Sequence, residues 1–257
     1  MHNLIENLPF ETGEGTGSLA RIGLVVLASD YTIENEFRRV FDTPELDFYT
    51  ARIANSPQVT PATLADMESR IASTASLILP GDQVDVMAYC CTSASVVLGE
   101  DVVFGQLAKA HPKALYTTPV TAATAALHAF GAKRIAVLTP YRSDINLQIN
   151  DFFKRANFSV EVFGSFNEEM DPVVARIDVE SLETALERLL ASADVDAAFV
   201  SCTSIRMMHA IEDLETRFGI PVTCSNQALA WHCLRLAGSN RQIKGMGSLF
   251  ELSVVEQ

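Results

Sequence analysis

The sequence predicts an α/β fold of two similar lobes, each a parallel sheet of about four strands flanked by helices. Short apolar runs alternate along the chain with segments whose apolar residues recur at helical spacing, which indicates strands alternating with helices. The pattern restarts midway, because residues 134–138, RIAVL, echo residues 21–25, RIGLV. We therefore expect two lobes related by a pseudo-twofold axis, with the functional site in the cleft between them.

The first half contains four runs that predict strands, most of them apolar throughout as in strands buried on both faces of a sheet. They are residues 22–28, 48–53, 84–90 and 114–116. Helical spacing follows each run, in residues 33–41, 60–71, 94–110 and 121–130. Pro61 suits the first position of its helix, and Gly131 ends the last one.

The second half repeats this alternation. Its predicted strands are residues 134–138, 160–163, 197–201 and 221–223. Its predicted helices are residues 143–153, 182–189, 205–218 and 227–236, and Gly219 closes the third of them. We expect residues 1–20 to form a flexible tail, residues 21–118 with 227–257 to form one lobe, and residues 119–226 to form the other.

Composition limits the classes of function. The chain has 257 residues, 48% of them hydrophobic, and a net charge of −13. Nucleic acids and anionic membranes require clustered Lys and Arg, so neither partner is expected. No apolar run approaches a membrane span, no signal-peptide pattern opens the chain, and the five cysteines fit a reducing compartment, so we expect a cytoplasmic protein. No Cys or His spacing predicts a metal site.

One tripeptide, Cys-Thr-Ser, occurs at the same place in both halves. It follows the apolar runs after Asp85 and Asp196, so Cys91 and Cys202 lie at predicted strand ends ahead of predicted helices. The positive end of a helix dipole and its free N–H groups favour a thiolate there. A buried cysteine is often only a small apolar side chain, but packing gives no reason for the tripeptide to recur. We therefore predict that both cysteines are catalytic.

Two further polar side chains fall at predicted carboxyl ends of strands, where parallel sheets bind ligands. Asp30 follows the first strand, and Tyr141 follows the first strand of the second half. If the lobes face each other, both line one cleft with the two cysteines. Asp30 is equally well explained as a turn residue, and Tyr141 as a buried aromatic side chain.

Four stretches carry a resemblance to a known family. They are residues 85–93, DVMAYCCTS; residues 139–141, TPY, with Asn146 beyond; residues 200–203, VSCT; and residues 219–228, GIPVTCSNQA. From about Arg21 to Gly238 the chain resembles the aspartate/glutamate racemase superfamily, and within it the maleate cis-trans isomerase and arylmalonate decarboxylase branch.

The resemblance implies a cofactor-independent enzyme with two facing cysteines. Decarboxylases of this branch keep only the cysteine that matches Cys202, so the presence of Cys91 as well favours an isomerase or racemase. In the family, backbone N–H groups and hydroxyls after each cysteine hold the substrate carboxylate, which here implies Thr92, Ser93 and Thr203 as substrate-binding residues. The strand-end tyrosine of the family matches Tyr141.

The chain departs from the maleate isomerases at two positions. Their two carboxylate-binding Asn residues match Asp30 and Asp171 here. Two acids would repel a second substrate carboxylate and would suit an ammonium or amide group. Asp171 is alternatively a loop acid ahead of Pro172. Residues 23–30, GLVVLASD, resemble the ectoine-utilisation members of the family, which implies an amino-acid-like substrate derived from ectoine.

Several functions therefore stay open. A two-cysteine isomerase acting on a small carboxylate could transfer a proton at one carbon or add a thiolate to a double bond. The alternatives are an arylmalonate-type decarboxylase and a two-lobed binding protein without catalysis. The binding protein explains the repeat but not the cysteine in each half. Apolar helix faces permit a homodimer or higher homo-oligomer without requiring one.

Overall fold

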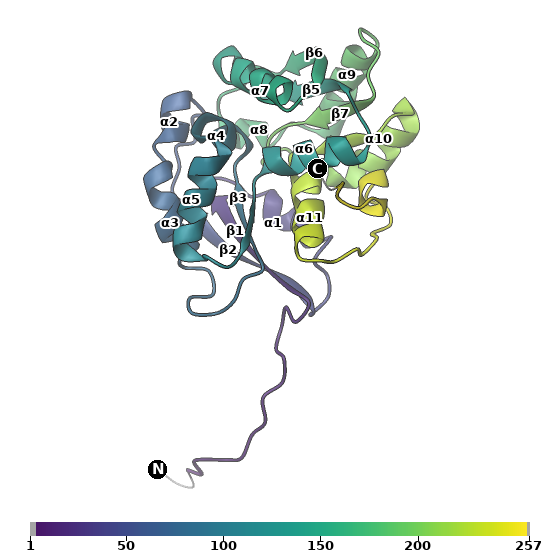
Figure 1. Cartoon of the computed structure of the whole chain (residues 1–257). Coiled ribbons are helices and arrows are strands. Elements are labelled where there is room, and N and C mark those ends of the chain that lie inside the picture. The colour runs from purple at the N-terminus through teal and green to yellow at the C-terminus, as the bar shows by residue number, and fades with distance from the viewer. Residues whose placement is uncertain (1–3, 256–257) are drawn as a thin grey trace.

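Two parallel sheets of four strands each form the centre of the protein (Figure 1). The computed structural model describes residues 4–255. The first sheet has the order β2-β1-β3-β4, with β1 at Ala20–Leu27, β2 at Leu46–Ile53, β3 at Val86–Cys90 and β4 at Leu115–Thr117. The second has the order β6-β5-β7-β8, with β5 at Arg134–Thr139, β6 at Ser159–Ser165, β7 at Ala197–Val200 and β8 at Val222–Cys224. The predicted two-lobed α/β fold is confirmed.

The two strands that precede the cysteine motifs are buried throughout. Every residue of β3 and of β7 is buried, as continuous apolar runs in a parallel sheet require. The edge strand β6 alternates exposed and half-buried residues along most of its length instead. The cysteine motifs therefore follow two completely enclosed strands.

Eleven α-helices connect and cover the strands in the described part of the chain. They are α1 Ile33–Phe37, α2 Pro61–Ala65, α3 Glu68–Ala75, α4 Thr92–Leu98, α5 Glu100–Ala110, α6 Pro119–Ala129, α7 Ser143–Arg155, α8 Asp171–Val174, α9 Val179–Leu190, α10 Ile211–Phe218 and α11 Ser225–Leu236. Two short 3-10 helices, Met208–Ala210 and Ser248–Glu251, complete the set. In the first lobe, α3 and α5 pack on the sheet, and α11 reaches β3 and β4 beside α1 (Figure 1).

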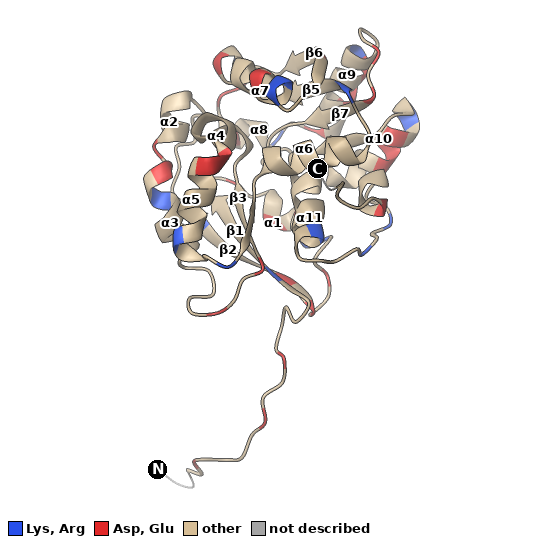
Figure 2. Cartoon of the chain, in the orientation of Figure 1, with Lys and Arg blue, Asp and Glu red and all other residues tan. Residues whose placement is uncertain are grey.

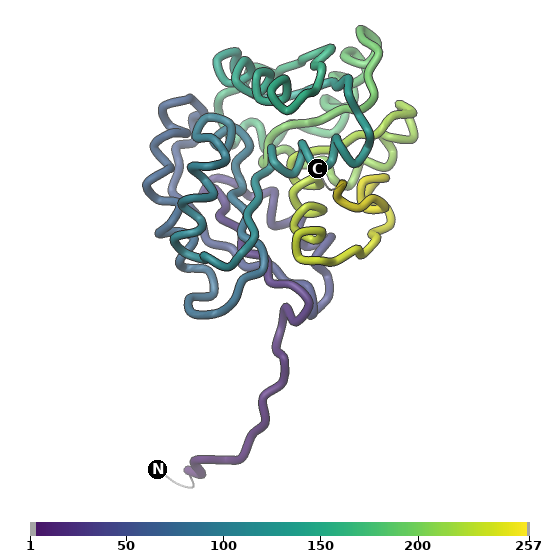
Figure 3. Tube along the Cα trace, viewed as in Figure 1, coloured from purple at the N-terminus to yellow at the C-terminus, as the bar shows by residue number. Residues whose placement is uncertain are grey.

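Two helices join the halves. Helix α6 follows the last strand of the first sheet, and α11 follows the last strand of the second. The two pack on each other, and α11 also contacts α1, β3 and β4, so the chain returns to the first half near its end (Figure 3). The lobe boundaries expected at residues 118 and 226 stay a prediction.

Four predicted helices are wrong in their extent. The helix expected over residues 33–41 ends at Phe37. Residues 94–110 form two helices, α4 and α5, because the chain turns at Gly99 with φ 85° and ψ 145°. The helix expected from Pro61 is likewise divided into α2 and α3. The helix expected from residue 205 begins only with the 3-10 turn at residue 208, so residues 203–207 after Cys202 are not helical.

The surface carries no continuous basic stripe in the view of Figure 2, where blue and red segments are dispersed over the outer helices. Within residues 4–255, no helix has the length and apolarity that crossing a membrane requires. The N-terminal segment extends away from the two lobes (Figure 1), and β1 begins at Ala20, one residue inside the expected tail. The expected flexibility of that tail stays a prediction, and its first three residues lie outside the described part.

Candidate active site

The two repeated cysteines line the same small pocket. Cys91 directly follows β3, and Cys202 lies two residues beyond β7. Their exposed fractions are 3% and 7%, and the pocket encloses about 20 Å³. That volume is close to the space one water molecule occupies. The two thiols therefore lie around one enclosed space at the carboxyl ends of both sheets.

Most of the expected site residues line this pocket. The predicted residues found there are Cys91, Thr92, Ser93, Tyr141, Asp171, Cys202 and Thr203. Sequence reasoning missed the rest of the lining: Leu27, Asn55, Ser56, Val59, Thr63, Leu64, Met67 and Ser204. These residues come chiefly from the end of β2 and from α2, where the sequence shows only ordinary helix spacing. No Lys, Arg or His lines the pocket within the described chain, so its only charged side chain is Asp171.

Cys91 caps the N-terminus of α4. Its Sγ lies 3.7 Å from Ser93 Oγ and faces the backbone N–H of Ala94. Burial nevertheless raises the pKa of the Cys91 thiol to about 12, because it outweighs the lowering by these two hydrogen bonds. The N–H at the helix N-terminus thus acts in the expected direction, but burial outweighs it in the protein without substrate.

Cys202 has a different backbone environment. Its φ is +113°, a region that residues other than glycine rarely adopt, and its N–H donates to Ser225 Oγ at 3.0 Å. Burial raises the pKa of its thiol, and Asp171 raises it further. The Tyr141 hydroxyl and the Ser204 N–H lower that pKa in part. No helix begins here, so the prediction of a helix dipole behind Cys202 is wrong.

Asp171 is the first residue of α8 and is 3% exposed. Its Oδ1 accepts a hydrogen bond from the Ser204 hydroxyl at 2.6 Å, and its Oδ2 accepts one from Ser29 at 2.5 Å. A carboxylate that lines the pocket and accepts from two hydroxyls keeps further acceptor capacity for a ligand. The alternative of a simple loop acid does not describe this environment.

Asp30 is buried beside the pocket but is not among the residues that line it. Its Oδ1 accepts from the N–H groups of Thr32 and Ile33 at 2.7 and 3.0 Å, at the start of α1. Its Oδ2 has no hydrogen-bond partner among residues 4–255. Burial raises the pKa of Asp30 to about 6, against the lowering by these N–H groups. Its role in substrate binding stays a prediction.

A hydrogen bond from Asn146 fixes the backbone of Tyr141. The side-chain amide of Asn146 donates to the Tyr141 carbonyl at 2.7 Å, and Asn146 Oδ1 accepts from the Thr139 hydroxyl at 2.5 Å. Burial raises the pKa of Tyr141 well above its ordinary value, so the phenol stays a donor. Its hydroxyl can therefore donate to the sulfur of Cys202.

Three buried polar residues around Cys202 were not predicted as site residues. Ser225 Oγ lies 2.9 Å from Thr92 Oγ1 and accepts from Cys202, which joins the two cysteine segments. Asn226 donates to the Thr203 carbonyl at 2.8 Å and to Glu36 at 2.7 Å. A usable signal existed for Glu36, because an acid between Ile33 and Phe37 falls on the apolar face of the helix.

A short backbone bridge lies beside the pocket. The Val59 N–H donates to the Glu169 carbonyl at 2.8 Å, and the Asp171 N–H donates to the Pro57 carbonyl at 2.9 Å. These bonds join the loop before α2 to the loop before α8. Because both Val59 and Asp171 line the pocket, the bridge connects the two lobes at the site.

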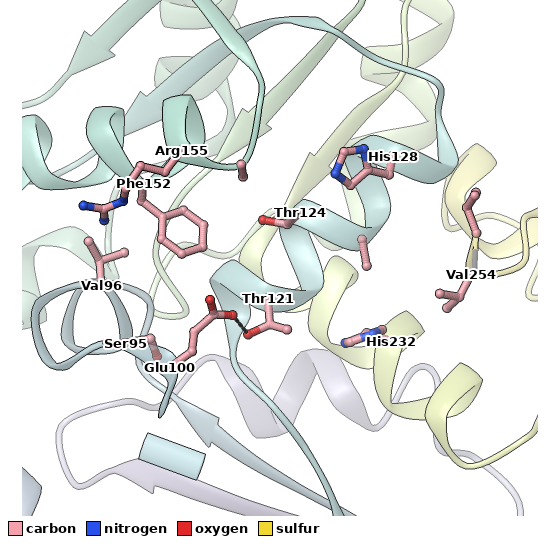
Figure 4. Close-up of a pocket in the computed structure, with 14 residues that line it drawn as sticks. Ser95, Val96, Glu100, Thr121, Thr124, His128, Phe152, Arg155, His232 and Val254 are labelled. Atoms are coloured by element: carbon pink, nitrogen blue, oxygen red, sulfur yellow. Dashed lines mark hydrogen bonds between the residues drawn. The ribbon is translucent and has the colours of Figure 1, made fainter. Parts of the chain in front are cut away.

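A larger cavity of about 660 Å³ lies elsewhere, among α4, α6, α7 and α11 (Figure 4). Glu100, Thr121, His128, Arg155 and His232 are among its lining, and Figure 4 shows the hydrogen bond from Thr121 to Glu100. It contains neither Cys91 nor Cys202. Cavity volume alone therefore does not identify the pocket that the two Cys-Thr-Ser segments share.

Comparison with known proteins gives one family. The arylmalonate decarboxylase family model matches residues 22–250. The maleate isomerase of Nocardia farcinica is 28% identical over 242 residues, which cover 90% of this chain and 95% of the relative.

Solved structures agree with this match. One is the maleate cis-trans isomerase of Nocardia farcinica, as a cysteine-to-serine mutant with a covalently bound succinylcysteine intermediate. Its TM-score is 0.82 at 27% identity, and the match covers 90% of this chain and 98% of that one. A cysteine-to-alanine variant of a Pseudomonas putida maleate isomerase with maleate has a TM-score of 0.81 at 25% identity, covering 92% and 99%.

Proposed function

Because this chain belongs to the arylmalonate decarboxylase family and is an isomerase, we propose that Cys91 and Cys202 act on opposite faces of one small carboxylate, without a cofactor. One observation carries the proposal: the two thiols, from corresponding strands of the two sheets, line one buried pocket. Packing does not require that correspondence, whereas a racemisation uses a group on each face of one carbon and a thiol-catalysed cis-trans reaction uses a nucleophile and a proton donor.

A cis-trans reaction would use one sulfur as a nucleophile. The thiolate adds to one alkene carbon, the π electrons move to the neighbouring carbon, and that carbon takes a proton from the other thiol. Rotation about the resulting single bond and reversal of both steps expel the thiolate and return the proton. The covalent succinylcysteine in the relative from Nocardia farcinica is the kind of adduct that this sequence forms.

A racemase reaction would use the same two residues. One thiolate takes the α-proton, and the other thiol returns a proton to the opposite face. The carbanion would be stabilised as an enediolate by hydroxyl and N–H donors, for which we propose Thr92, Ser93 and Thr203, because all three line the pocket. Both reactions need one thiolate, which burial disfavours in the protein without substrate.

The charge of the pocket favours a substrate that carries an ammonium or amide group besides its carboxylate. Asp171 lines the pocket, and no basic side chain of the described chain does. A second carboxylate would meet like charge, whereas an ammonium group would pair with Asp171 and would also lower the cost of forming a thiolate. An amino-acid-like compound, such as an intermediate of ectoine breakdown, has this charge pattern.

Proton NMR in deuterated water tests the proposal. The panel is maleate, aspartate, glutamate and acetylated diaminobutyrate. Loss of an α-proton signal means proton abstraction and a racemase. Conversion of the maleate vinyl signal to that of fumarate means a cis-trans isomerase, and it contradicts the preference for an ammonium-bearing substrate.

Alanine variants provide the control for the two-thiol mechanism. Cys91→Ala and Cys202→Ala should each abolish turnover of the active substrate, while Cys233→Ala, a buried cysteine of α11 away from the pocket lining, should retain it. Near-normal activity of either of the first two variants contradicts the mechanism.

A further inference from the structure

Glu36 is a buried carboxylate that connects α1 to the segment after Cys202. It is 1% exposed. Its Oε1 accepts from the backbone N–H groups of Met207 and Met208 at 2.9 and 2.7 Å, and its Oε2 accepts from Asn226 Nδ2 at 2.7 Å. None of these partners carries a positive charge, so burying the carboxylate costs free energy that no ion pair offsets.

All three partners of Glu36 are donors. Two are backbone N–H groups, and the third is the side-chain amide nitrogen of Asn226. The orientation of the Asn226 amide follows because both of its partners, the Glu36 carboxylate and the Thr203 carbonyl, are acceptors. A carboxylate satisfies three donors with two oxygens. A protonated carboxyl or a glutamine amide would turn a hydrogen toward at least one donor and lose that contact.

The segment that Glu36 holds has little regular structure of its own. Residues 203–207 are not helical, and their conformation depends on side chains from distant parts of the chain. Thr32 donates to the Ser204 carbonyl at 2.9 Å, Asn226 donates to the Thr203 carbonyl, and Glu36 fixes the two N–H groups at the far end. Cys202 begins this segment in a strained backbone conformation.

The other cysteine needs no such support. Cys91 is followed at once by α4, whose backbone hydrogen bonds begin at the Cys91 carbonyl, and the Ser95 hydroxyl also donates to that carbonyl at 2.6 Å. A local helix therefore orients Cys91, whereas contacts from α1 and α11 orient Cys202.

We propose that Glu36 is a positioning residue for Cys202, holding residues 203–208 so that the thiol faces the pocket in the geometry the reaction needs. This inference rests on the proposed role of Cys202. Glu36 itself does not line the pocket and takes no part in the chemistry.

Glu36→Gln tests the proposal, with Glu34→Gln as the matched control. Glu34 lies on the same helix but pairs at the surface with Arg52 at 3.0 Å. The readout is the rate at which iodoacetamide alkylates each cysteine, resolved by peptide mass spectrometry in the absence of substrate. Cys91 serves as the internal reference. The assay needs no turnover, so it stays informative if the proposed reaction is wrong.

For Glu36→Gln we expect the alkylation rate of Cys202 to rise about tenfold and that of Cys91 to change by less than about twofold. The reason is that losing one hydrogen bond to a charged acceptor frees the segment around Cys202 only. With the active substrate, kcat should fall roughly ten- to hundredfold while KM changes little. Glu34→Gln should resemble the wild type in both assays. Unchanged Cys202 alkylation, or equal acceleration of both cysteines, overturns the proposal.

Hydrogen exchange of the wild-type protein keeps the proposal testable if Glu36→Gln does not fold. The amides of Met207 and Met208 should exchange as slowly as those of β7, although Met207 only precedes and Met208 only begins a short 3-10 helix. Exchange at the rate of an exposed loop overturns the proposal.

Discussion

At the scale of single residues, we expect Asp171 to decide which charges the pocket accepts. Its two oxygens already accept from Ser29 and Ser204, so the carboxylate is fixed in orientation before a ligand arrives. A fixed charge in an enclosed, water-poor pocket acts more strongly than one at the surface, because little solvent screens it. We therefore expect the residue to discriminate between an ammonium group and a second carboxylate.

Asp171→Asn should invert that discrimination. For an ammonium-bearing substrate we expect kcat/KM to fall about ten- to hundredfold, because a hydrogen bond between charged partners is replaced by a neutral one. Activity on maleate should rise. The measurement is kcat/KM for both substrates, with Asp151→Asn on the exposed face of α7 as the control. Equal losses on both substrates would show that Asp171 does not select by charge.

Asp30 gives a prediction about stability and pH. Its folded pKa is about 6, above the ordinary value of 3.8, so the folded state holds this proton more tightly than the unfolded state. The stabilising effect of the bound proton is complete below about pH 4 and is lost as the pH rises through about 6. Asp30→Asn keeps an acceptor for Thr32 and Ile33 and removes the buried charge.

We therefore expect Asp30→Asn to raise the free energy of unfolding at pH 8 by up to about 3 kcal/mol, and by much less at pH 4.5. Urea unfolding at the two pH values measures this difference. A variant less stable than the wild type at pH 8 would contradict the interpretation.

At the scale of elements, the first residue of α11 links the two cysteine segments. Ser225 Oγ accepts from the Cys202 N–H and lies within hydrogen-bond distance of the Thr92 hydroxyl, at the start of α4. The helix that returns the chain to the first half thus fixes the spacing of both halves of the site.

Ser225→Ala should reduce kcat by roughly tenfold, because two buried polar groups lose a partner and each loss costs about 1–3 kcal/mol. The melting temperature should also fall by several degrees. Ser248→Ala, which removes a hydroxyl paired with Glu215 away from the pocket, is the control and should leave kcat unchanged. Normal kcat in Ser225→Ala would exclude the linking role.

The sequence predicted the strands well and the helix boundaries less well, for a physical reason. Buried parallel strands such as β3 and β7 are uniformly apolar, which is a local signal. The break at Gly99 and the irregular segment after Cys202 depend on backbone conformation and on partners far along the chain, such as Glu36. The repeated cysteines were visible in the sequence, and Asn226 could be expected to help order the cleft, but Ser225 became recognisable as a neighbour of the site only once the two sheets were placed.

At the scale of the whole molecule, the pocket is too small to admit a substrate as it stands. About 20 Å³ accommodates one water, so we expect the lobes or their loops to separate before binding. The backbone bridge of Val59 to Glu169 and of Pro57 to Asp171 lies between the lobes at the pocket. It is the connection whose opening would admit a ligand.

Amides of this bridge should therefore exchange with deuterium faster than those of β1 and β5, and a bound substrate should slow them. Peptides covering residues 57–59 and 169–171 measure this by mass spectrometry, and peptides of β1 serve as the reference. Exchange that stays as slow as in β1, with or without substrate, would place the entrance elsewhere.

The matching strand orders of the two sheets imply descent from a half-length ancestor by gene duplication and fusion. Such an ancestor would have paired with a copy of itself, and its pocket would have held two identical thiols. In the present chain one thiol begins a helix, and the other begins an irregular segment. A homodimer encoded by one short gene cannot produce that difference, so fusion is what allowed mutation to adapt each cysteine without altering the other.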